Sequence, residues 1–483
     1  MQTRSVEPSN SWRYAIGKHL FSLRNCLTNF CIFKVKVCII GAGLAGLRSA
    51  IHFEQVGIDY TIFEGSNRIG GRVYPFEYQD GYLHFGAEYV NGVDNEVYNL
   101  VEKYDLFDKT KPRTDDLWML DQDNSITLVN GHLVPKKILD KFNDYIRYLN
   151  VALYEKSIKI NQLSVENEIN NQFIEFLRDV PENDHEIYES LINVYKNYFQ
   201  TEWSSPVGEL SLSNLSIWDD GTEEEDSAVL NKQGFYEILK DFRSKIPAGN
   251  IRLNCEVINV KEEENIMVTL KNGEVLHFDA CIVTCSLGYL KKHHKTLFTP
   301  QLTSVKQDAI NRMGFGNNLK VFLEYSDSWW NSLNTILILT HGENEDFMVF
   351  QPSSWAENIL LCWIAGSGPK KICDKTDFEL KILLDTHLHD QLKNYLDVKA
   401  SVKIYRKNWI NDEFTLGSYS YLTPGQIVGE DICILAQPVL KDNNPVICFA
   451  GEHTDSTMYQ TTVGAVRSGL REASRISEHT FEK

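Results

Sequence analysis

The chain has 483 residues, of which 43% are hydrophobic, and a formal net charge of −18 at pH 7. This length and composition suggest roughly two or three domains with large cores, and the negative charge argues against nucleic acid as a partner. No apolar run reaches the length of about 18 residues that a membrane-spanning helix needs, so we expect no membrane segment. The ten cysteines include no C-x-x-C pair, which favours reduced thiols in a cytoplasmic enzyme over a disulfide-rich secreted protein. The sequence predicts no metal site.

The two ends of the chain carry little information about function. Residues 1–34 are polar, with several basic residues and one acid, Glu7, which predicts a flexible tail. A transit peptide is the alternative for this segment. The last five residues carry no peroxisomal signal, so the cytoplasm stays the expected compartment.

A glycine-rich turn follows the first predicted strand. Val35–Ile40 contains a short apolar run, typical of a buried parallel strand, and Gly41, Gly43 and Gly46 follow it with the spacing G-x-G-x-x-G. These glycines allow a tight turn, a close approach of the backbone to a pyrophosphate, and close packing of the next helix. Glu64 ends the following apolar run, where an acid hydrogen-bonds a ribose hydroxyl. This segment predicts dinucleotide binding.

A second glycine pair lies just beyond that acid, flanked by two cations. It consists of Arg68, Gly70, Gly71 and Arg72. The glycines allow another close backbone approach to the pyrophosphate, and Arg72 would offset its charge. An NAD site does not need this second loop, so the pattern favours a longer dinucleotide. An ordinary loop is the alternative if this motif is taken alone.

The middle of the chain predicts both helices and strands. Residues 140–199 alternate apolar and charged residues with helical spacing. A helix is expected from Gly234 to about residue 246, followed by strands over 251–260, 266–271 and 280–284. Asn272 and Gly273 favour a hairpin turn between the last two strands.

The C-terminal region repeats the pattern of strand, glycine turn and helix. Val446–Ala450 is an apolar strand, and Gly451 and Glu452 follow it directly. Gly464 and Gly469 then lie within a predicted helix. This arrangement predicts a second set of contacts with the same dinucleotide.

Together these motifs resemble those of the flavin-containing amine oxidase family. The matching patterns are E-x-x-x-R-x-G-G-R at 64–72, F-A-G-E-x-T at 449–454 and G-A-x-x-S-G-x-R-E-A at 464–473. Further family landmarks at 86–92, 281–292, 314–324 and 417–425 occur in the family's order, and those at 314–324 and 417–421 look most like polyamine and spermine oxidases. The resemblance runs from about residue 35 to about residue 476.

The resemblance implies an α/β (α+β) fold with two interleaved domains. A discontinuous, Rossmann-like FAD-binding domain would comprise residues 35–95, 230–300 and 440–478. A substrate-binding domain of mixed sheet and helices would comprise residues 96–229 and 301–439. The acidic cluster at 219–226 is most simply a solvated loop, and an acidic collar that gathers polyamine is the alternative.

The implied activity is FAD-dependent oxidation of spermine or an N-acetylated polyamine. Hydride transfer to the flavin would be followed by reoxidation with oxygen, which gives hydrogen peroxide, and by hydrolysis of the imine. Two alternatives stay open, a relative of histone-lysine demethylases and a catalytically silent flavoprotein. The expected partners are the amine and oxygen, and the expected state is a monomer or weak dimer.

The resemblance also assigns cofactor contacts beyond the first glycine motif. These are Gly86, Val257, Trp409, Glu452, Thr462 and Val463, in addition to Gly41, Gly43, Gly46, Glu64 and Arg72. Ser418 stands where monoamine oxidases place the cysteine that bonds to FAD, so non-covalent FAD is expected.

Four residues are expected to face the substrate. Lys320 interrupts an apolar strand, which is unusual for a lysine, and the family lysine at this place reaches the flavin through a water. An exposed lysine on an edge strand is the alternative. Tyr419 would form an aromatic wall of the substrate passage. Asn91 and Thr461 depart from the family, because Asn91 replaces a usual histidine or glutamate and Thr461 replaces a tyrosine of monoamine oxidases.

Overall fold

The computed structural model describes residues 35–110, 124–159, 162–217, 227–330, 332–340, 342, 344–426 and 429–481. The expected tail at 1–34 and the acidic cluster at 219–226 lie outside these ranges. Among the helices of the described ranges, none has both the length and the apolar character needed to cross a membrane.

A six-stranded sheet carries the predicted dinucleotide-binding motifs, in the order β22-β23-β13-β1-β2-β9. Its central strand β1 (Lys36–Ile40) pairs in parallel with β2 (Asp59–Phe63) and β13 (Ala280–Val283). The outer strands are β9 (Ile251–Arg252), β23 (Asn444–Phe449) and the antiparallel edge strand β22 (Val439–Lys441). The strands of this sheet are continuous apolar runs at the centre, as expected for a parallel sheet that is covered on both faces.

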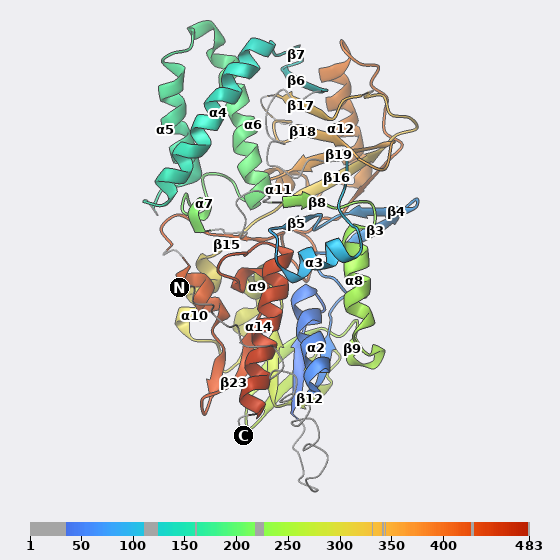
Figure 1. Cartoon of the computed structure of the whole chain (residues 1–483), viewed down its shortest axis with the longest axis vertical. Helices are drawn as coiled ribbons and strands as arrows, with labels where there is room; N and C mark the ends of the chain where they lie inside the picture. Colours follow the sequence, from blue (N-terminus) through green and yellow to red (C-terminus); the bar gives the residue numbers. More distant parts are fainter. Residues whose placement is uncertain are drawn as a thin grey trace, which may run out of the picture. The chain divides into compact units, whose positions relative to one another are not determined.

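Two helices that carry the glycine motifs lie side by side against this sheet. They are α2 (Leu44–Val56) and α14 (Thr462–Phe481), in the lower half of Figure 1. Their backbones approach closely, because a Cβ atom at Gly469 would lie 2.2 Å from the Ala45 carbonyl oxygen. The Ser49 hydroxyl donates to the Gly469 carbonyl at 2.9 Å. The glycine in the C-terminal helix therefore serves helix packing.

A four-stranded sheet corrects two expectations. It has the order β12-β11-β10-β14, with β10 (Val257–Glu262), β11 (Ile266–Leu270), β12 (Val275–Phe278) and β14 (Phe298–Thr299). The single strand expected over 251–260 is wrong, because Asn254 has a positive φ of 55° and the chain turns there from β9 into β10. The turn at Asn272 and Gly273 joins β11 to β12, whereas residues 280–283 enter the six-stranded sheet.

A seven-stranded sheet forms the other half of the chain, in the order β20-β16-β19-β18-β17-β6-β7. Its strands are β6 (Ser125–Val129), β7 (His132–Leu133), β16 (Leu319–Glu324), β17 (Thr335–Leu339), β18 (Val349–Pro352), β19 (Ile359–Ile364) and β20 (Lys403–Arg406). Because β16 pairs with β19 on one side and β20 on the other, Lys320 lies on an interior strand. The alternative of an exposed edge-strand lysine is therefore wrong.

Helices cover both faces of the seven-stranded sheet (Figure 1). On one face, α12 (Asp377–Leu392) packs its leucines against the sheet. On the other face lie α4 (Lys136–Ser157), α5 (Val165–Leu177) and α6 (His185–Trp203). The same apolar cluster continues to Cys38 and Phe63 in the six-stranded sheet, so the two halves share one core.

The remaining elements connect these layers. They are β3 (Pro75–Tyr78), β4 (Gly81–His84), β5 (Tyr89–Asn91), α3 (Glu96–Lys103), η2 (Glu182–Asp184), α7 (Asn214–Ile217), β8 (Ser227–Val229), α8 (Gly234–Ser244), η3 (Ala248–Asn250), α9 (Leu287–Leu297), α10 (Ser304–Arg312), β15 (Gly314–Phe315), α11 (Gly368–Ile372), β21 (Ser420–Tyr421), α13 (Glu430–Ala436) and η4 (Glu452–Thr454). The expected α/β class is confirmed, and the proposed boundaries between two domains stay a prediction.

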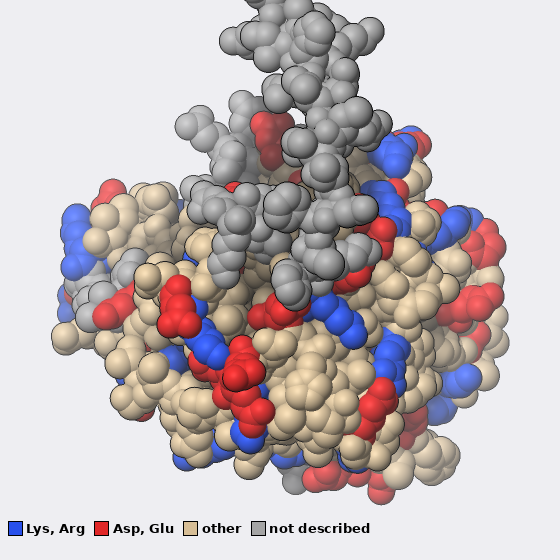
Figure 2. All heavy atoms as spheres, turned by 90° about the horizontal axis from the view of Figure 1, so that it is seen from below, with Lys and Arg blue, Asp and Glu red and all other residues tan. Residues whose placement is uncertain are grey.

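Acidic and basic side chains are interspersed on the face drawn in Figure 2. Such a mixture gives that face no broad field of one sign over the described residues.

Candidate active site

A cavity of about 370 Å³ is lined by residues from both large sheets. Its lower wall follows the carboxyl ends of parallel strands, with Gly41 after β1, Glu64 after β2, Thr284 after β13 and Gly451 after β23. This edge of an open parallel sheet is where ligands bind in α/β folds. Lys320 of β16 and residues of the segment around Tyr419 line other parts of the wall.

Two glycine loops form a surface that fits a pyrophosphate. Gly43 forms an isolated bridge with Gly70, and the Gly70 amide donates to the Ala42 carbonyl at 2.8 Å. A Cβ atom at Gly43 would meet no atom within 4 Å, and one at Gly71 would meet only the Gly43 Cα, at 3.5 Å. Both glycines line the cavity, so their bare backbones leave open space for a large anionic group. The N-terminus of α2 lies at the same loop and favours negative charge there.

Glu64 is held ready at the end of β2. One of its carboxylate oxygens accepts from the Ala42 amide at 2.8 Å, and the other accepts from the amide and hydroxyl of Ser66. A carboxylate has about four acceptor positions, so these bonds orient it and leave capacity for ribose hydroxyls. Its place on the cavity wall fits the expected role.

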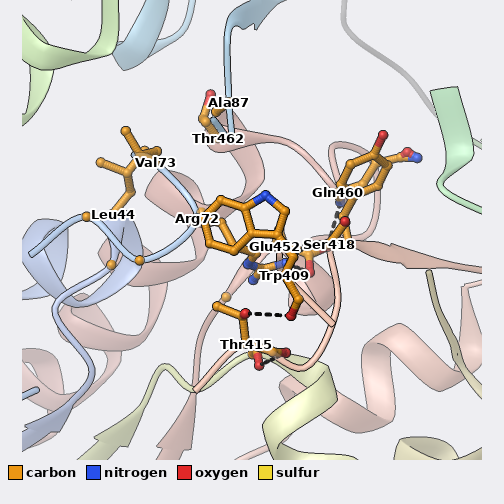
Figure 3. Close-up of a pocket in the computed structure, with 18 of the residues that line it drawn as sticks. Leu44, Arg72, Val73, Ala87, Trp409, Thr415, Ser418, Glu452, Gln460 and Thr462 are labelled. Carbon is orange, nitrogen blue, oxygen red and sulfur yellow. Dashed lines mark hydrogen bonds and ion pairs between the residues drawn. The ribbon is translucent and has the colours of Figure 1, made fainter. Parts of the chain in front are cut away.

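Arg72 is fixed by a residue from the other end of the chain. Its guanidinium donates to the Glu452 carboxylate at 2.8 Å and to the Ser418 carbonyl at 2.7 Å (Figure 3). Burial opposes ionisation of Glu452, but the charge of Arg72, with His453 and the Ser420 hydroxyl, lowers its pKa below the usual value. The N-terminal and C-terminal motifs are therefore joined by a partly buried ion pair.

Most of the expected cofactor residues line this one cavity. They are Gly41, Gly43, Glu64, Arg72, Gly86, Val257, Trp409, Glu452 and Thr462. The buried Thr462 hydroxyl has no hydrogen-bond partner among the described residues, which suits contact with a bound group. Gly46 and Val463 do not line the cavity. A Cβ at Gly46 would lie 2.0 Å from the Gly41 carbonyl oxygen, and Val463 is buried in the core.

Lys320 lies in the wall with its charge paired. Its ammonium nitrogen is 2.7 Å from a carboxylate oxygen of Glu88 and 5.0 Å from the ring centre of Trp363. Burial lowers the pKa of Lys320, and Glu88 partly offsets this effect. The pair is close to neutral overall, so it adds a strong hydrogen-bonding group to the wall without adding net charge.

Tyr419 is held in place by two neighbours. Its hydroxyl donates to the Thr201 carbonyl at 2.6 Å and accepts from the Asn318 amide at 2.8 Å. The Ser418 hydroxyl exchanges hydrogen bonds with the backbone of Asn318, at 2.7 and 3.0 Å. The ring of Tyr419 is thus a rigid aromatic wall, and the Ser418 hydroxyl is engaged with the backbone.

Asn91 and Thr461 both line the cavity. The side-chain amide of Asn91 donates to the Ser227 hydroxyl at 2.8 Å, which leaves its carbonyl oxygen as an acceptor. The Thr461 hydroxyl donates to the Met458 carbonyl at 2.7 Å and accepts from the Gly464 amide at 3.0 Å. The polar group of Thr461 therefore serves the start of α14, and Asn91 is the more accessible of the two.

Glu202, at the end of α6, is a carboxylate that the sequence did not reveal. Its side chain is exposed to the space of the cavity that it lines, although the surrounding protein atoms desolvate the carboxyl group. Burial raises the pKa of Glu202 to about 7. No described basic side chain forms an ion pair with it, so this carboxylate is available to a cationic ligand.

Sequence reasoning also missed other residues of the substrate side, namely Glu88, Ser227, Asn318 and Gln351, all of which line the cavity. Glu88 lies within the family landmark at 86–92, in which Gly86 and Asn91 were the predicted site residues. Glu88 and Lys320, which pair in the structure, are 232 positions apart in the chain. No local spacing signals such a contact.

Comparison with known proteins agrees with this geometry. Probable polyamine oxidase 5 of Arabidopsis thaliana is 25% identical, over 92% of this chain and 98% of that protein. The peroxisomal N(1)-acetyl-spermine/spermidine oxidase of Homo sapiens is 25% identical, over 91% of this chain and 94% of that protein. Lysine-specific histone demethylase 1 homolog 3 of Oryza sativa subsp. japonica is 26% identical over 92% of this chain, but over 54% of that protein.

The model of the family described as flavin containing amine oxidoreductase matches residues 44–477. This range begins just after Gly43 and includes the second glycine loop, Lys320 and most of the C-terminal helix α14. The chain therefore belongs to the flavin-containing amine oxidoreductase family.

Proposed function

We propose that the chain binds FAD non-covalently and oxidises polyamines, with oxygen as the electron acceptor. Two features support FAD held without a covalent bond. The glycine loops and Glu64 offer backbone and ribose contacts suited to a dinucleotide, and Ser418 stands where a cysteine would be needed for covalent attachment. The cytoplasmic location and the monomeric or weakly dimeric state stay predictions.

The observation that carries the substrate proposal is the carboxylate of Glu202, which forms no ion pair with a basic side chain of the described residues. Lys320 and Glu88 neutralise each other, so ionised Glu202 leaves the substrate side of the cavity negative. A carboxylate removed from bulk water gains most from a cation that replaces its lost hydration. A polyamine has a second nitrogen that remains charged while another reacts. Glu202 therefore suits a substrate with more than one amine.

A bound flavin would accept the electrons, so the protein chain has to position the amine and to accept and donate protons. The reacting nitrogen must be neutral before hydride leaves its neighbouring carbon. Alkyl amines resemble lysine, with a pKa near ~10.4, so roughly one molecule in a thousand is neutral at pH 7.4. Tyr419 would restrict the orientation of the chain of the amine, and Lys320 would orient a water for hydrolysis of the resulting imine.

The test is hydrogen peroxide production from a substrate panel. We expect spermine or an N-acetylated polyamine to give the highest specificity constant, followed by spermidine, with simple monoamines far behind. A methylated-lysine peptide in the same panel tests the demethylase alternative. Peroxide from the peptide alone would contradict the proposal, and no peroxide from any amine would favour a catalytically silent flavoprotein.

The state of the flavin is tested separately. Acid precipitation should release all of the yellow colour into the supernatant, with the absorption spectrum of FAD. Colour that stays with the precipitated protein would show a covalent bond and contradict this part of the proposal.

A further inference from the structure

His84 is a buried histidine whose ring the surrounding protein leaves unsatisfied. It ends β4, and its residue surface is 4% exposed. Neither ring nitrogen has a hydrogen-bond partner among the described residues. The ring packs against the first turn of α8, where a Cβ atom at Gly234 would lie 2.4 Å from Nε2. The absence of a side chain at Gly234 therefore makes room for the His84 ring, which forms no hydrogen bond with the described residues.

A second, smaller cavity of about 60 Å³ lies beside this ring. His84, Gln351 and Ser353 contribute polar groups to its wall, and the lining extends to Ser354, which is exposed. One water needs roughly 10–15 Å³ of such space and two to four polar partners. The small cavity has the volume and the polar lining for a short row of waters, and buried ring nitrogens require partners of this kind.

Glu88 belongs to the walls of both cavities. Tyr89, Gln351 and Trp363 are shared in the same way, so these four residues separate the small cavity from the active-site cavity. On the active-site side, Glu88 accepts a hydrogen bond from Lys320 at 2.7 Å. Polar groups therefore follow one another from Lys320, through Glu88 and His84, to the exposed residue Ser354.

We propose that His84 and the hydrated small cavity form a proton path between the Lys320–Glu88 pair and solvent. The inference rests on the proposed amine oxidation. In that reaction the substrate ammonium loses one proton before its carbon gives up a hydride. One proton returns when dioxygen takes up the two electrons and a hydrogen to become hydrogen peroxide. Water then adds to the iminium carbon and the C–N bond breaks, which gives an aldehyde and an ammonium.

Such a path would let the proton reach solvent without crossing the part of the cavity that the amine would occupy. Water in the small cavity can take the proton from the Glu88 carboxylate and donate it to one ring nitrogen of His84. The other ring nitrogen then releases its own proton to the next water. The ionisable groups around the ring are Glu88 and Lys320, with Tyr82 and Tyr89 on the wall of the small cavity.

The protonation state of His84 suits transfer rather than storage of a proton. Burial, opposed by the charge of Glu88 and aided by that of Lys320, lowers the pKa of His84 to about 4. The ring is therefore neutral near pH 7, with one nitrogen as donor and the other as acceptor. A neutral imidazole can accept a proton on one side while it releases one on the other.

The first test is a high-resolution crystal structure of the flavin-loaded protein. We expect ordered waters in the small cavity, with at least one bonded to a ring nitrogen of His84. A dry cavity would overturn the proposal. This measurement does not depend on which substrate, if any, the enzyme oxidises.

The second test measures flavin reoxidation after light-driven reduction without substrate. His84→Ala should slow the reaction with oxygen by roughly ten- to a hundred-fold, at the lower end of the usual contribution of a positioned proton-transfer group. Added imidazole should restore part of the rate. Leu361→Phe, which fills the small cavity from β19 without removing a polar group, should also slow it.

His387→Gln is the matched control. His387 lies on α12, is equally buried and also has a pKa lowered to about 4 by burial, but its ring is hydrogen-bonded to the Phe347 carbonyl. This variant should reoxidise at the normal rate. Unchanged rates in both cavity variants, or a slow His84→Ala protein that imidazole does not rescue, would assign His84 a structural role and overturn the proposal. Failure of the substrate panel alone would contradict only the proposed function.

Discussion

The two sides of the active-site cavity are built by different means. The cofactor side consists largely of backbone, with glycine loops at strand ends and one acid held by the Ala42 amide. The substrate side consists of side chains from distant segments, among them Asn91, Glu202, Lys320 and Tyr419. The first depends on a chain conformation that few sequences permit, and the second depends on where side chains meet after folding. Substitutions on the two sides should therefore impair the protein in different ways.

The largest effect is expected on the cofactor side, from Gly86→Val. A Cβ atom at Gly86 would lie 1.7 Å from the Arg72 carbonyl oxygen and 3.3 Å from the Trp409 ring. The backbone of the second glycine loop must move, at a cost of roughly 3 kcal/mol or more. We expect loss of nearly all bound flavin, measured as the ratio of absorbance at the flavin band to that of the protein.

Gly249→Ala is the control for this change. A Cβ atom there would meet no atom within 4 Å, and the residue does not line the cavity. This variant should keep its flavin. A Gly86→Val protein with a full complement of flavin would show that the cofactor side tolerates backbone displacement, which would break the comparison.

Lys320→Met tests the substrate side without touching the cofactor cradle. We expect flavin to stay bound, while turnover falls by about 10²–10³-fold, the usual effect of removing one preorganised stabilising group. The variant also leaves Glu88 without its cation, which lowers stability. The double variant with Glu88→Gln separates these effects, because it should regain thermal stability but stay slow. Unchanged turnover in both proteins would make Lys320 a structural residue.

This contrast also explains what the sequence could predict. The spacing of Gly41, Gly43, Gly46 and Glu64 encodes a local strand–turn–helix geometry, so this geometry could be predicted from consecutive residues. Consecutive residues could not predict the contact between Lys320 and Glu88 or the presence of Glu202 in the cavity wall. Each of these arises from the packing of segments that are far apart in the chain.

Errors in the predicted strands had a local cause. The strand expected over 251–260 divides at Asn254, whose positive φ allows the chain to pass from one sheet to another. Apolar alternation alone does not reveal such a turn, although asparagine is enriched among residues with positive φ. The hairpin turn at Asn272 and Gly273 was found, but its partner strand depended on which of two sheets residues 280–283 would join.

Glu202→Gln should affect affinity more than chemistry. A hydrogen bond to a charged group is worth about 1.5–3 kcal/mol, which corresponds to roughly a 10- to 100-fold rise in the Michaelis constant for a polyamine. Flavin content and the oxidation of any monoamine substrate should not change. Glu189→Gln, an exposed position on the same helix, is the matched control. An equal loss with polyamines and monoamines would argue against Glu202 as a cation partner.

The pH dependence of polyamine affinity sharpens this test. Burial raises the pKa of Glu202 to about 7. Below that pH the carboxyl is protonated and cannot pair with an ammonium, so the Michaelis constant should rise as pH falls through about 7. The Glu202→Gln protein should lack this inflection. If the wild-type and variant profiles were parallel, another group would govern the dependence.

The smallest effect is expected from Asn91→His. The side-chain amide of Asn91 donates to the Ser227 hydroxyl at 2.8 Å, so Asn91 offers the substrate a neutral carbonyl oxygen. A neutral histidine at this position can accept from a substrate ammonium through a ring nitrogen, which is more basic than an amide oxygen and so a stronger acceptor. We expect the Michaelis constant for spermine or its acetylated form to fall by a few-fold, with turnover and flavin content unchanged. Ser227→Ala serves as the control, because it frees the Asn91 amide without replacing the residue itself. If Asn91→His left both activity and selectivity as they were, Asn91 would not contact the substrate, and selectivity on this side of the cavity would rest on Glu202.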